Sequence, residues 1–209
     1  ISEPYKLLFA PILSPTLWER KGNVPALTDL LCTYLKRGPE LVVATRSLEG
    51  VLGIFQKLLS SRSTDQHANM FIDTIFLNFA STELAQYMPT IYNLLLRSLQ
   101  ETMKSTRAGA ATKLACVRRF FHTICVYSSM NGGSQTVDEG LEKIERGLVA
   151  NLIATVFEPK VSKFACTCSG MELRRMIVGG TRILIDSSAI AGNLEIWGKL
   201  AKSLVSIIM

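Results

Sequence analysis

Apolar side chains recur along this chain at the spacing of α-helices. The clearest stripe comprises Leu48, Val51, Leu52, Phe55, Leu58 and Leu59. These positions share one face of a helix. The same spacing recurs in three further stripes: Ile91, Leu94, Leu95 and Leu99; Leu114, Val117, Phe121 and Ile124; and Leu194, Trp197, Leu200, Ala201, Leu204, Ile207 and Ile208. No long segment alternates with period two, so we predict an all-α protein without a sheet.

Capping and breaking residues divide these stripes into separate helices. The pairs Ser63 and Gln66, Thr136 and Glu139, and Ser169 and Glu172 fit the capping-box spacing. Ser14-Pro15 is typical of a helix start, and Gly38-Pro39 of a break. We predict helices over 5–12, 15–19, 24–37, 46–60, 64–79, 83–87, 89–103, 107–129, 138–157, 160–165, 170–186 and 194–208.

The long helices form pairs. First helices begin near 24, 64, 107 and 170, and second helices near 46, 89, 138 and 194. The first three pairs start about 40 residues apart, which is the period of HEAT and armadillo repeats. A single amphipathic pair cannot bury its own apolar face, so neighbouring pairs stack. We therefore predict an α-α superhelix of about four pairs, with approximate repeats at 15–60, 64–103, 107–157 and 170–208.

Composition excludes a disordered chain and a membrane-inserted one. Of the 209 residues, 48% are hydrophobic and only 19% are charged, which is enough apolar material for a core. The longest stretch without formal charge, from Phe120 to Val137, contains His122 and two glycines, so it is not a uniform apolar span. Because the chain starts at Ile1 and ends on apolar residues, we expect it to be part of a longer protein.

The charge bears on the kind of partner, and the cysteine content bears on the redox compartment. The net charge of +6 is modest, and lysine and arginine are scattered, so we expect no nucleic-acid partner. The five cysteines, at 32, 116, 125, 166 and 168, are an odd number, and no Asn-x-Ser/Thr sequon is present. Both observations favour a reducing compartment with every cysteine as a thiol.

Residue sets that support catalysis, cofactor binding or metal binding are not apparent. His67 and His122 both lie in predicted helices, and no Gly-x-Ser-x-Gly or phosphate-loop sequence occurs. Cys166 and Cys168 are close, but no second pair of ligands follows at zinc spacing. We therefore expect no enzyme activity, no cofactor and no metal.

Two other features have ordinary structural explanations. The pairs Gly50 with Gly53 and Gly179 with Gly180 lie inside helical stripes, where glycine allows helices to pack closely. Arg118 and Arg119 stand beside aromatic residues, as in some nucleic-acid readers. They point away from the apolar stripe, so we interpret them as a solvated helix face, and Arg174-Arg175 in the same way.

One segment resembles a known family. Residues 13–27 read LSPTLWERKGNVPAL, and residues 51–59 read VLGIFQKLL. This pattern is similar to the C-terminal region of the cellular apoptosis susceptibility (CAS) exportins, within the importin-beta or karyopherin superfamily of HEAT-repeat receptors. The likeness is close over about 5–60 and continues as a helix pattern over 61–209. In that setting Trp18 anchors a short helix and should be buried, and Asn23 precedes a helix with Pro25 in its first turn.

The resemblance implies a non-enzymatic transport receptor. Such a receptor binds importin-alpha together with GTP-bound Ran in the nucleus and releases both after GTP hydrolysis, so it shuttles between nucleus and cytoplasm, here as a monomer. The chain resembles about the last fifth of it. Two alternatives stay open from the residues: a HEAT or armadillo scaffold unrelated to transport, and a helical enzyme or nucleic-acid-binding domain.

Partner binding in a solenoid of this kind is expected on the second helices, which usually line the concave face. Their polar positions are the candidates, and we expect them to share an outward side and to bind through many small contributions, without a deep pocket. They are Gln56, Lys57, Arg97, Gln100, Glu101, Lys104, Lys199 and Lys202.

Overall fold

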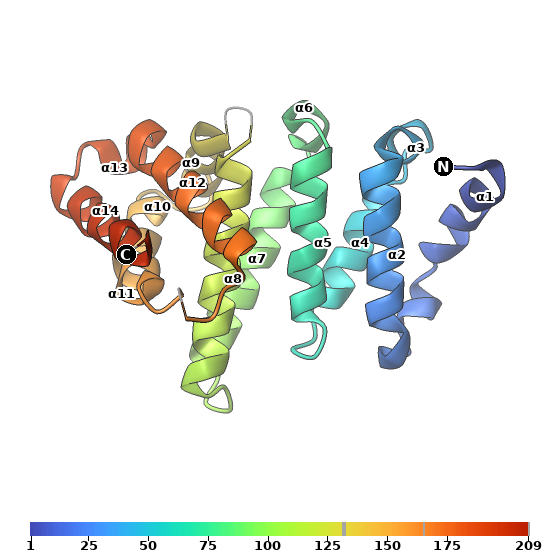
Figure 1. Ribbon diagram of the computed structural model, residues 1–209, viewed down its shortest axis with the longest axis horizontal. Helices are drawn as coiled ribbons and strands as arrows, with labels where there is room; N and C mark the ends of the chain where they lie inside the picture. The colour runs from blue at the N-terminus through green and yellow to red at the C-terminus, as the bar shows by residue number, and fades with distance from the viewer. Residues whose placement is uncertain (131–132, 165, 209) are drawn as a thin grey trace. The chain divides into compact units, whose positions relative to one another are not determined.

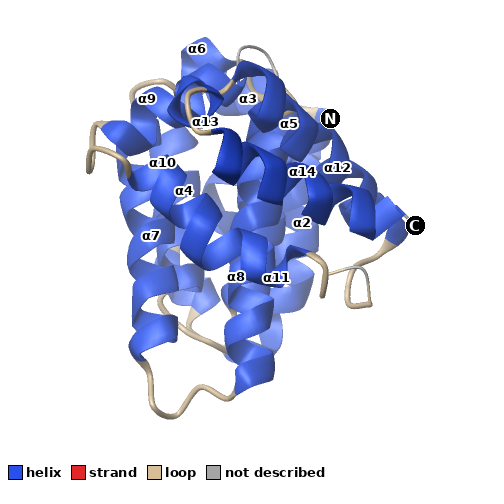
Figure 2. Ribbon diagram, turned by 90° about the vertical axis from the view of Figure 1, so that its left-hand side faces the viewer, coloured by secondary structure: helices blue, strands red, loops and turns tan. Residues whose placement is uncertain are grey.

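The structure is a computed structural model that describes residues 1–130, 133–164 and 166–208. Every regular element in these ranges is helical, and Figure 2 shows helices joined by loops and turns there without a strand. The all-α prediction is therefore confirmed. The chain divides into two compact units, residues 1–79 and 80–209, each described by itself below.

Unit 1 is built around helix α5, which packs against both α2 and α4 (Figure 1). Its centre contains aromatic side chains such as Phe55 and Phe71, both fully buried. Tyr34 of α2 also donates a hydrogen bond of 2.6 Å to the carbonyl of Tyr5, which ties α1 to α2. The elements are α1 (Glu3–Ile12), the 3-10 turns η1 (Pro15–Trp18) and η2 (Lys21–Asn23), α2 (Val24–Arg37), α3 (Pro39–Ala44), α4 (Leu48–Leu59) and α5 (Asp65–Asn78).

Unit 2 is built around helix α8, which packs against α7, α9 and α12. The second half of α8 is buried without interruption from Phe120 to Ser128. The elements are α6 (Ser81–Leu84), α7 (Met88–Lys104), α8 (Ala110–Ser128), α9 (Gly133–Glu142), α10 (Leu148–Asn151), the π-helical turn η3 (Leu152–Phe157), α11 (Glu158–Val161), α12 (Gly170–Asp186), α13 (Ser188–Ala191) and α14 (Leu194–Ile208).

A cluster of phenylalanines joins α8 to η3 and to the segment after α11. The ring centroid of Phe157 lies 4.9 Å from that of Phe121 and 5.7 Å from that of Phe120. Phe164 lies 6.0 Å from Phe121 on another side. Aromatic rings bury large apolar areas, so this cluster is a main source of stability within unit 2.

Trp18 is buried as predicted, with 4% of its surface exposed. Its indole nitrogen donates a hydrogen bond of 2.8 Å to the carbonyl of Ile12. This bond satisfies the one polar group of the indole, which is what allows tryptophan to be buried. Trp18 therefore fixes η1 against the end of α1.

One of the three predicted capping boxes is present. The hydroxyl of Ser169 accepts a hydrogen bond from the amide of Glu172, whose carboxylate accepts one from the amide of Ser169, at 3.3 and 2.8 Å. The other two predictions are wrong. Helix α5 follows Thr64, and Ser63 instead lies 3.0 Å from the hydroxyl of Ser61. Thr136 lies inside α9, which already contains Gly133.

The single helix predicted over 138–157 is also wrong. Helix α9 ends at Glu142, and Gly147 adopts a left-handed conformation with φ of 79° before α10 begins. The carboxylate of Glu142 accepts hydrogen bonds from the amides of Gly147 and Val149, at 2.6 and 3.1 Å. It thus supplies acceptors for the new helix start, and the chain turns there.

The interpretation of Gly179 and Gly180 as packing residues is confirmed. A Cβ atom on Gly179 would lie 2.0 Å from the main-chain oxygen of Cys125, so α12 and α8 approach through their backbones. A Cβ on Gly180 would lie 2.9 Å from the side chain of Leu204 on α14. The same interpretation is wrong for Gly53, where an added Cβ would meet nothing within 4 Å.

Candidate partner-binding surface

Helix α7 presents one continuous exposed face. Four of the predicted binding residues lie on it, together with Pro89, Thr90 and Asn93 near the start of the helix. Positions spaced by three, four and seven residues fall on the same side of a helix. The structure therefore brings these four predicted residues together: Arg97, Gln100, Glu101 and Lys104.

The charges on this face are partly paired. The guanidinium Nε of Arg97 donates a hydrogen bond of 2.8 Å to the carboxylate of Glu101, one helical turn later. Both side chains are mostly exposed, so the pair contributes little to stability and each charge stays accessible to a partner. The α7 face thus offers a mixed polar surface rather than a deep site.

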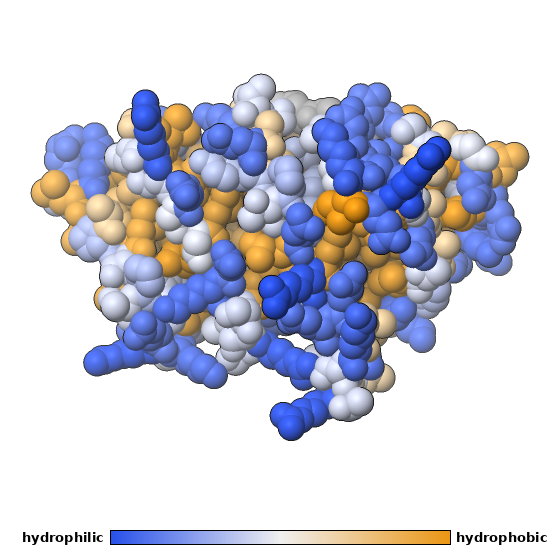
Figure 3. All heavy atoms as spheres, turned by 180° about the vertical axis from the view of Figure 1, so that it is seen from behind, coloured by the Kyte–Doolittle hydropathy of each residue, from blue (hydrophilic) through white to orange (hydrophobic). Residues whose placement is uncertain are grey.

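Figure 3 shows unit 2 from the side on which α7 lies, since α7 is behind α8 in Figure 1. Long hydrophilic side chains project from this side, with smaller areas of hydrophobic atoms between them. Such a mixture is compatible with reversible protein binding but does not distinguish a binding surface, because non-obligate interfaces are about as apolar as the rest of a protein surface.

Lys199 and Lys202 lie on α14, apart from the α7 face. Helices α8 and α12 stand between the two, because α7 packs on α8, α8 on α12, and α12 on α14. Lys199 donates a hydrogen bond of 2.5 Å to Glu195. This hydrogen bond and the opposite charge raise the pKa of Lys199 and lower the pKa of Glu195.

Gln56 and Lys57 lie on α4 in unit 1, and only Gln56 is fully exposed. The amine of Lys57 donates a hydrogen bond of 2.8 Å to the carbonyl of Pro15 and lies 3.7 Å from the carboxylate of Glu19. Lys57 is half-buried and its side chain reaches back to η1, so its part in partner binding stays a prediction.

Arg118 is not the solvated residue that the sequence indicated. Its guanidinium donates a hydrogen bond to the carbonyl of Thr167 and lies 3.9 Å from the sulfur of Cys168. Burial raises the pKa of the Cys168 thiol, and the nearby charge of Arg118 opposes that rise. Arg118 thus anchors the segment before α12 to α8, a contact between residues 50 apart that no local pattern reveals.

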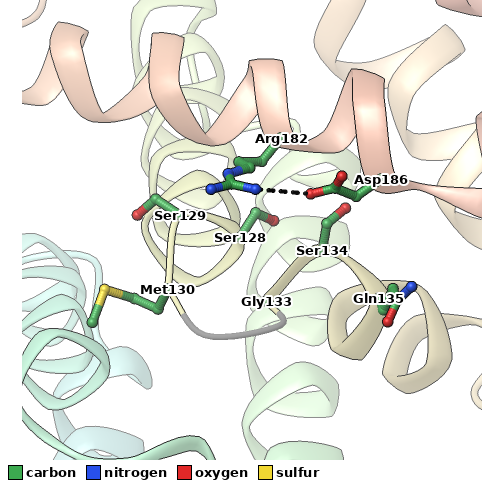
Figure 4. A pocket seen from close by; sticks show the side chains of 8 residues that line it. All are labelled: Ser128, Ser129, Met130, Gly133, Ser134, Gln135, Arg182 and Asp186. Atoms are coloured by element: carbon green, nitrogen blue, oxygen red, sulfur yellow. Dashed lines mark ion pairs between the residues drawn. The ribbon is translucent and has the colours of Figure 1, made fainter.

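A pocket of about 390 Å³ lies in unit 2 between the end of α8, the start of α9, and α12 (Figure 4). Arg182 and Asp186 lie 3.6 Å apart at its wall, and the buried hydroxyls of Ser128 and Ser134 point toward them. No hydrogen-bond partner for these two hydroxyls is present among the described residues. Histidine and cysteine do not line the pocket.

All five cysteines lie in the described part of the chain as thiols outside any disulfide. Within the described ranges, no group of three or more histidine, cysteine, aspartate or glutamate side chains is placed to hold a metal ion. Of the helices formed by described residues, none combines the length and apolar character needed to cross a membrane.

Sequence reasoning missed the exposed apolar residues of the last two long helices. Met171, Val178 and Ile185 lie on the outer side of α12, with 58%, 53% and 71% of their surfaces exposed. Their spacing of seven residues indicates one line along a helix, but the same spacing also describes a core-facing stripe. Only the structure shows on which side of α12 the core lies.

The fold defines a helical-repeat protein of the HEAT type. Comparisons with known proteins give the family. The family model described as "CAS/CSE protein, C-terminus" matches residues 1–209, so the chain belongs to the CAS/CSE family of exportins.

Individual relatives agree with this assignment. The chain is similar to the importin-alpha re-exporter of Schizosaccharomyces pombe, with 36% identity over 160 residues, 76% of this chain and 16% of that protein. It is 27% identical to human Exportin-2 over 211 residues, 99% of this chain and 20% of that protein. The chain thus spans a fifth or less of the length of these relatives.

A solved structure shows the same fold. The exportin Cse1 in its cargo-free, cytoplasmic state matches the whole chain with a TM-score of 0.79 and 23% identity, over 21% of that protein. The predicted α-α superhelix is thereby confirmed as the fold class. The individual repeat boundaries stay a prediction, and the division between the two compact units falls at Phe79, inside the predicted repeat 64–103.

Proposed function

We propose that this chain is part of a nuclear transport receptor that carries importin-alpha out of the nucleus together with GTP-bound Ran. The observation that supports the proposal is the family match along all 209 residues, together with relatives named importin-alpha re-exporter and Exportin-2. On this proposal the receptor is a monomer that shuttles between nucleus and cytoplasm, catalyses no reaction and binds no nucleic acid.

The mechanism follows from helix stacking. In a solenoid each repeat contacts only its neighbours, so small changes of angle between repeats add along the array. A change of curvature then brings distant surfaces onto two partners at once, which couples their binding free energies. This chain contributes repeats to that array, and its part in the coupling is to present a partner surface.

We assign the principal partner surface of this chain to the α7 face. Arg97, Gln100, Glu101 and Lys104 lie together there, whereas Lys57 is engaged by η1. Lys199 and Lys202 on α14, and Gln56 on α4, are secondary candidates. Each side chain is exposed and contributes little alone, so binding energy is spread over the face.

The test uses the full-length protein in pull-downs of importin-alpha with GTP-loaded Ran. The double variant Arg97→Glu with Lys104→Glu reverses two charges on α7, and we expect several-fold weaker binding of the partner pair. The exchange variant Arg97→Glu with Glu101→Arg keeps the ion pair and the net charge but exchanges the two positions, so it shows whether the partner responds to where the charges lie or only to their sum.

The matched control is Lys36→Glu, a charge reversal at an exposed position of α2. Unchanged binding in the α7 double variant, with weakened binding in the Lys36 variant, would show that the partner uses the first helices. Failure of the unmodified protein to bind importin-alpha with GTP-loaded Ran would refute the transport function itself.

A further inference from the structure

Helix α12 exposes an apolar stripe to solvent along its whole length. Met171, Val178 and Ile185 are spaced by seven residues, so they follow one line on the helix surface for about 21 Å, at 1.5 Å per residue. The opposite side of α12 is the one that packs in the core, through Met176, which is fully buried, and through Gly179 against α8. The stripe is therefore not the inner face of this helix.

Helix α14 extends the apolar surface. Figures 1 and 2 show α12 and α14 side by side. They meet at a seam where the indole nitrogen of Trp197 donates a hydrogen bond of 2.9 Å to the carbonyl of Leu184. Leu194 and Val205 lie on the flank of α14 next to Trp197, with 82% and 51% of their surfaces exposed.

The exposed apolar residues of both helices lie on the sides turned away from the core. On α12 the buried Gly180, which meets Leu204, lies nearly opposite Val178, since two residues turn an α-helix by about 200°. On α14 Leu204 and Trp197 lie between the core-facing Leu200 and the exposed Val205. We call the six exposed apolar residues of the two helices the α12/α14 face: Met171, Val178, Ile185, Leu194, Trp197 and Val205.

The charges around the α12/α14 face have one predominant sign. Arg174 and Arg182 lie on the same side of α12 as the apolar stripe. The acidic residues of this helix lie off that line: Glu172 caps the helix start, and Asp186 lies beside Arg182 at 3.6 Å. On α14 Lys202 is exposed, and the exposed Glu195 beside Leu194 is paired with Lys199 at 2.5 Å. A partner that covers the apolar stripe therefore meets mainly positive charge at its edges.

We propose that the α12/α14 face is a docking site for an amphipathic helix with an apolar stripe and acidic flanks, supplied by a protein partner. The spacing of seven residues on α12, about two helical turns, fits the side chains of a second helix that lies alongside it. Six large exposed apolar side chains on two packed helices are more than isolated surface residues, and such patches mark interaction sites. The site is separate from the α7 face and does not depend on the transport function.

The probe is a short, fluorescently labelled helical peptide with leucines at i, i+4, i+7 and i+11 and glutamates on both flanks. A second peptide has lysine at every glutamate position. Anisotropy is measured with the full-length protein at physiological salt. We expect saturable binding of the acidic peptide and at least about tenfold weaker binding of the basic one. A tenfold difference in affinity corresponds to about 1.4 kcal/mol.

Two variants locate the site. Val178→Ser with Ile185→Ser should weaken the acidic peptide at least about tenfold. The matched control is Val43→Ser on α3, which removes an apolar side chain with 44% exposure and should leave binding unchanged. Arg174→Glu with Arg182→Glu replaces the two arginines beside the stripe and should reverse the preference toward the basic peptide; because it also breaks the ion pair of Arg182 with Asp186, circular dichroism must first show that the variant is folded.

Three results would overturn the proposal: equal binding of the two peptides, no binding of either, or unchanged binding in both double variants. A fourth is self-association. If light scattering shows a dimer that the Val178→Ser and Ile185→Ser variant abolishes, while the acidic peptide does not bind, then the face joins copies of this chain instead.

Discussion

The amine of Lys57 donates a hydrogen bond to the main-chain carbonyl of Pro15, 42 residues earlier in the chain. The bond links the last turn of α4 to η1, and the carboxylate of Glu19 lies 3.7 Å from the same amine. A residue that the sequence places on a binding face is thus a clamp within unit 1.

The hydrogen bond from Lys57 to Pro15 predicts an effect on the stability of unit 1. Lys57→Met keeps the aliphatic stem but removes the donor, and we expect the free energy of unfolding to fall by about 1 kcal/mol. The neighbouring Gln56→Ala should leave it within about 0.5 kcal/mol. Urea titrations of the two variants check this, and equal midpoints would contradict the clamp.

Replacement of Trp18 should lower the free energy of unfolding more than replacement of Lys57. Trp18→Ala leaves a cavity beside Ile12 and should lower the free energy of unfolding by about 3–5 kcal/mol. Trp18→Phe fills most of the space but leaves the Ile12 carbonyl without its donor, so we expect a loss of about 1–3 kcal/mol. Thermal melting followed by circular dichroism measures both, and a Trp18→Ala protein with unchanged melting temperature would refute the anchoring role.

Gly179 tests the close contact of α12 with α8. A methyl group at this position would meet the backbone of Cys125, which cannot rotate away, so Gly179→Ala should destabilise by about 3 kcal/mol or prevent folding. Gly53→Ala is the control inside α4. An added methyl there meets open space and should stabilise by up to about 1 kcal/mol, because alanine favours the helix. The same sign for both substitutions would show that the contact is looser than described.

The buried carboxyl of Asp138 predicts a pH effect. Burial raises its pKa above the ordinary 3.8, although hydrogen bonds from Ser187 and from the amide of Ala189 oppose the rise. The folded state therefore holds a proton more tightly than the unfolded state, so this group's contribution to stability increases as the pH falls through the raised pKa toward 3.8.

Comparison with Asp138→Asn isolates this effect, because the other carboxylates are common to both proteins. We expect the difference in unfolding free energy between the original protein and the variant to shift in favour of the original protein from pH 7 to pH 4. Urea midpoints at several pH values measure it, and a pH-independent difference would show that the pKa of Asp138 is ordinary.

Thiol reactivity should separate the cysteines by position. Cys166 is exposed, whereas Cys125 is fully buried and burial raises the pKa of its thiol well above the ordinary 9.0. Because the thiolate is the reactive form, alkylation of the native protein should label Cys166 first and Cys125 last. Mass spectrometry of timed samples gives the order, and early labelling of Cys125 would mean that α8 is accessible in the folded state.

Local signals predicted the long helices well. The bounds 24–37, 170–186 and 194–208 agree with α2, α12 and α14 residue for residue. In these segments a clear apolar stripe coincides with strong end signals, such as the Ser169 capping box. Local preference and tertiary packing act in the same direction there, so periodicity is enough.

The prediction failed where individual side-chain hydrogen bonds, and not apolar periodicity, decide the path of the chain. The break after α9 depends on the carboxylate of Glu142, which accepts a hydrogen bond from the amide of Gly147 five residues later. The short helix α13 follows Ser187, whose hydroxyl donates a hydrogen bond to Asp138, 49 residues away. Helix α3 was missed because only Val42 of its residues is buried, which gives no stripe to detect.

The candidate surface was predictable from the sequence only where it depends on spacing within one helix. The shared exposed face of Arg97, Gln100, Glu101 and Lys104 follows from helical spacing alone. The engagement of Lys57 by Pro15 does not, since it joins separate elements. Nor does the outward orientation of Val178, because an apolar stripe in a sequence cannot be distinguished from a core stripe until the neighbouring helices are placed.

The backbone contact at Gly179 also fixes the position of α12 along the axis of α8. To slide α12 along α8 by one helical turn, the chain would have to put Arg175 or Ile183 where Gly179 now meets Cys125, and neither side chain fits against a main-chain oxygen. Helices α8 and α12 can therefore move only together, as one rigid pair. A movement that shifts α12 along α8 would have to break this contact.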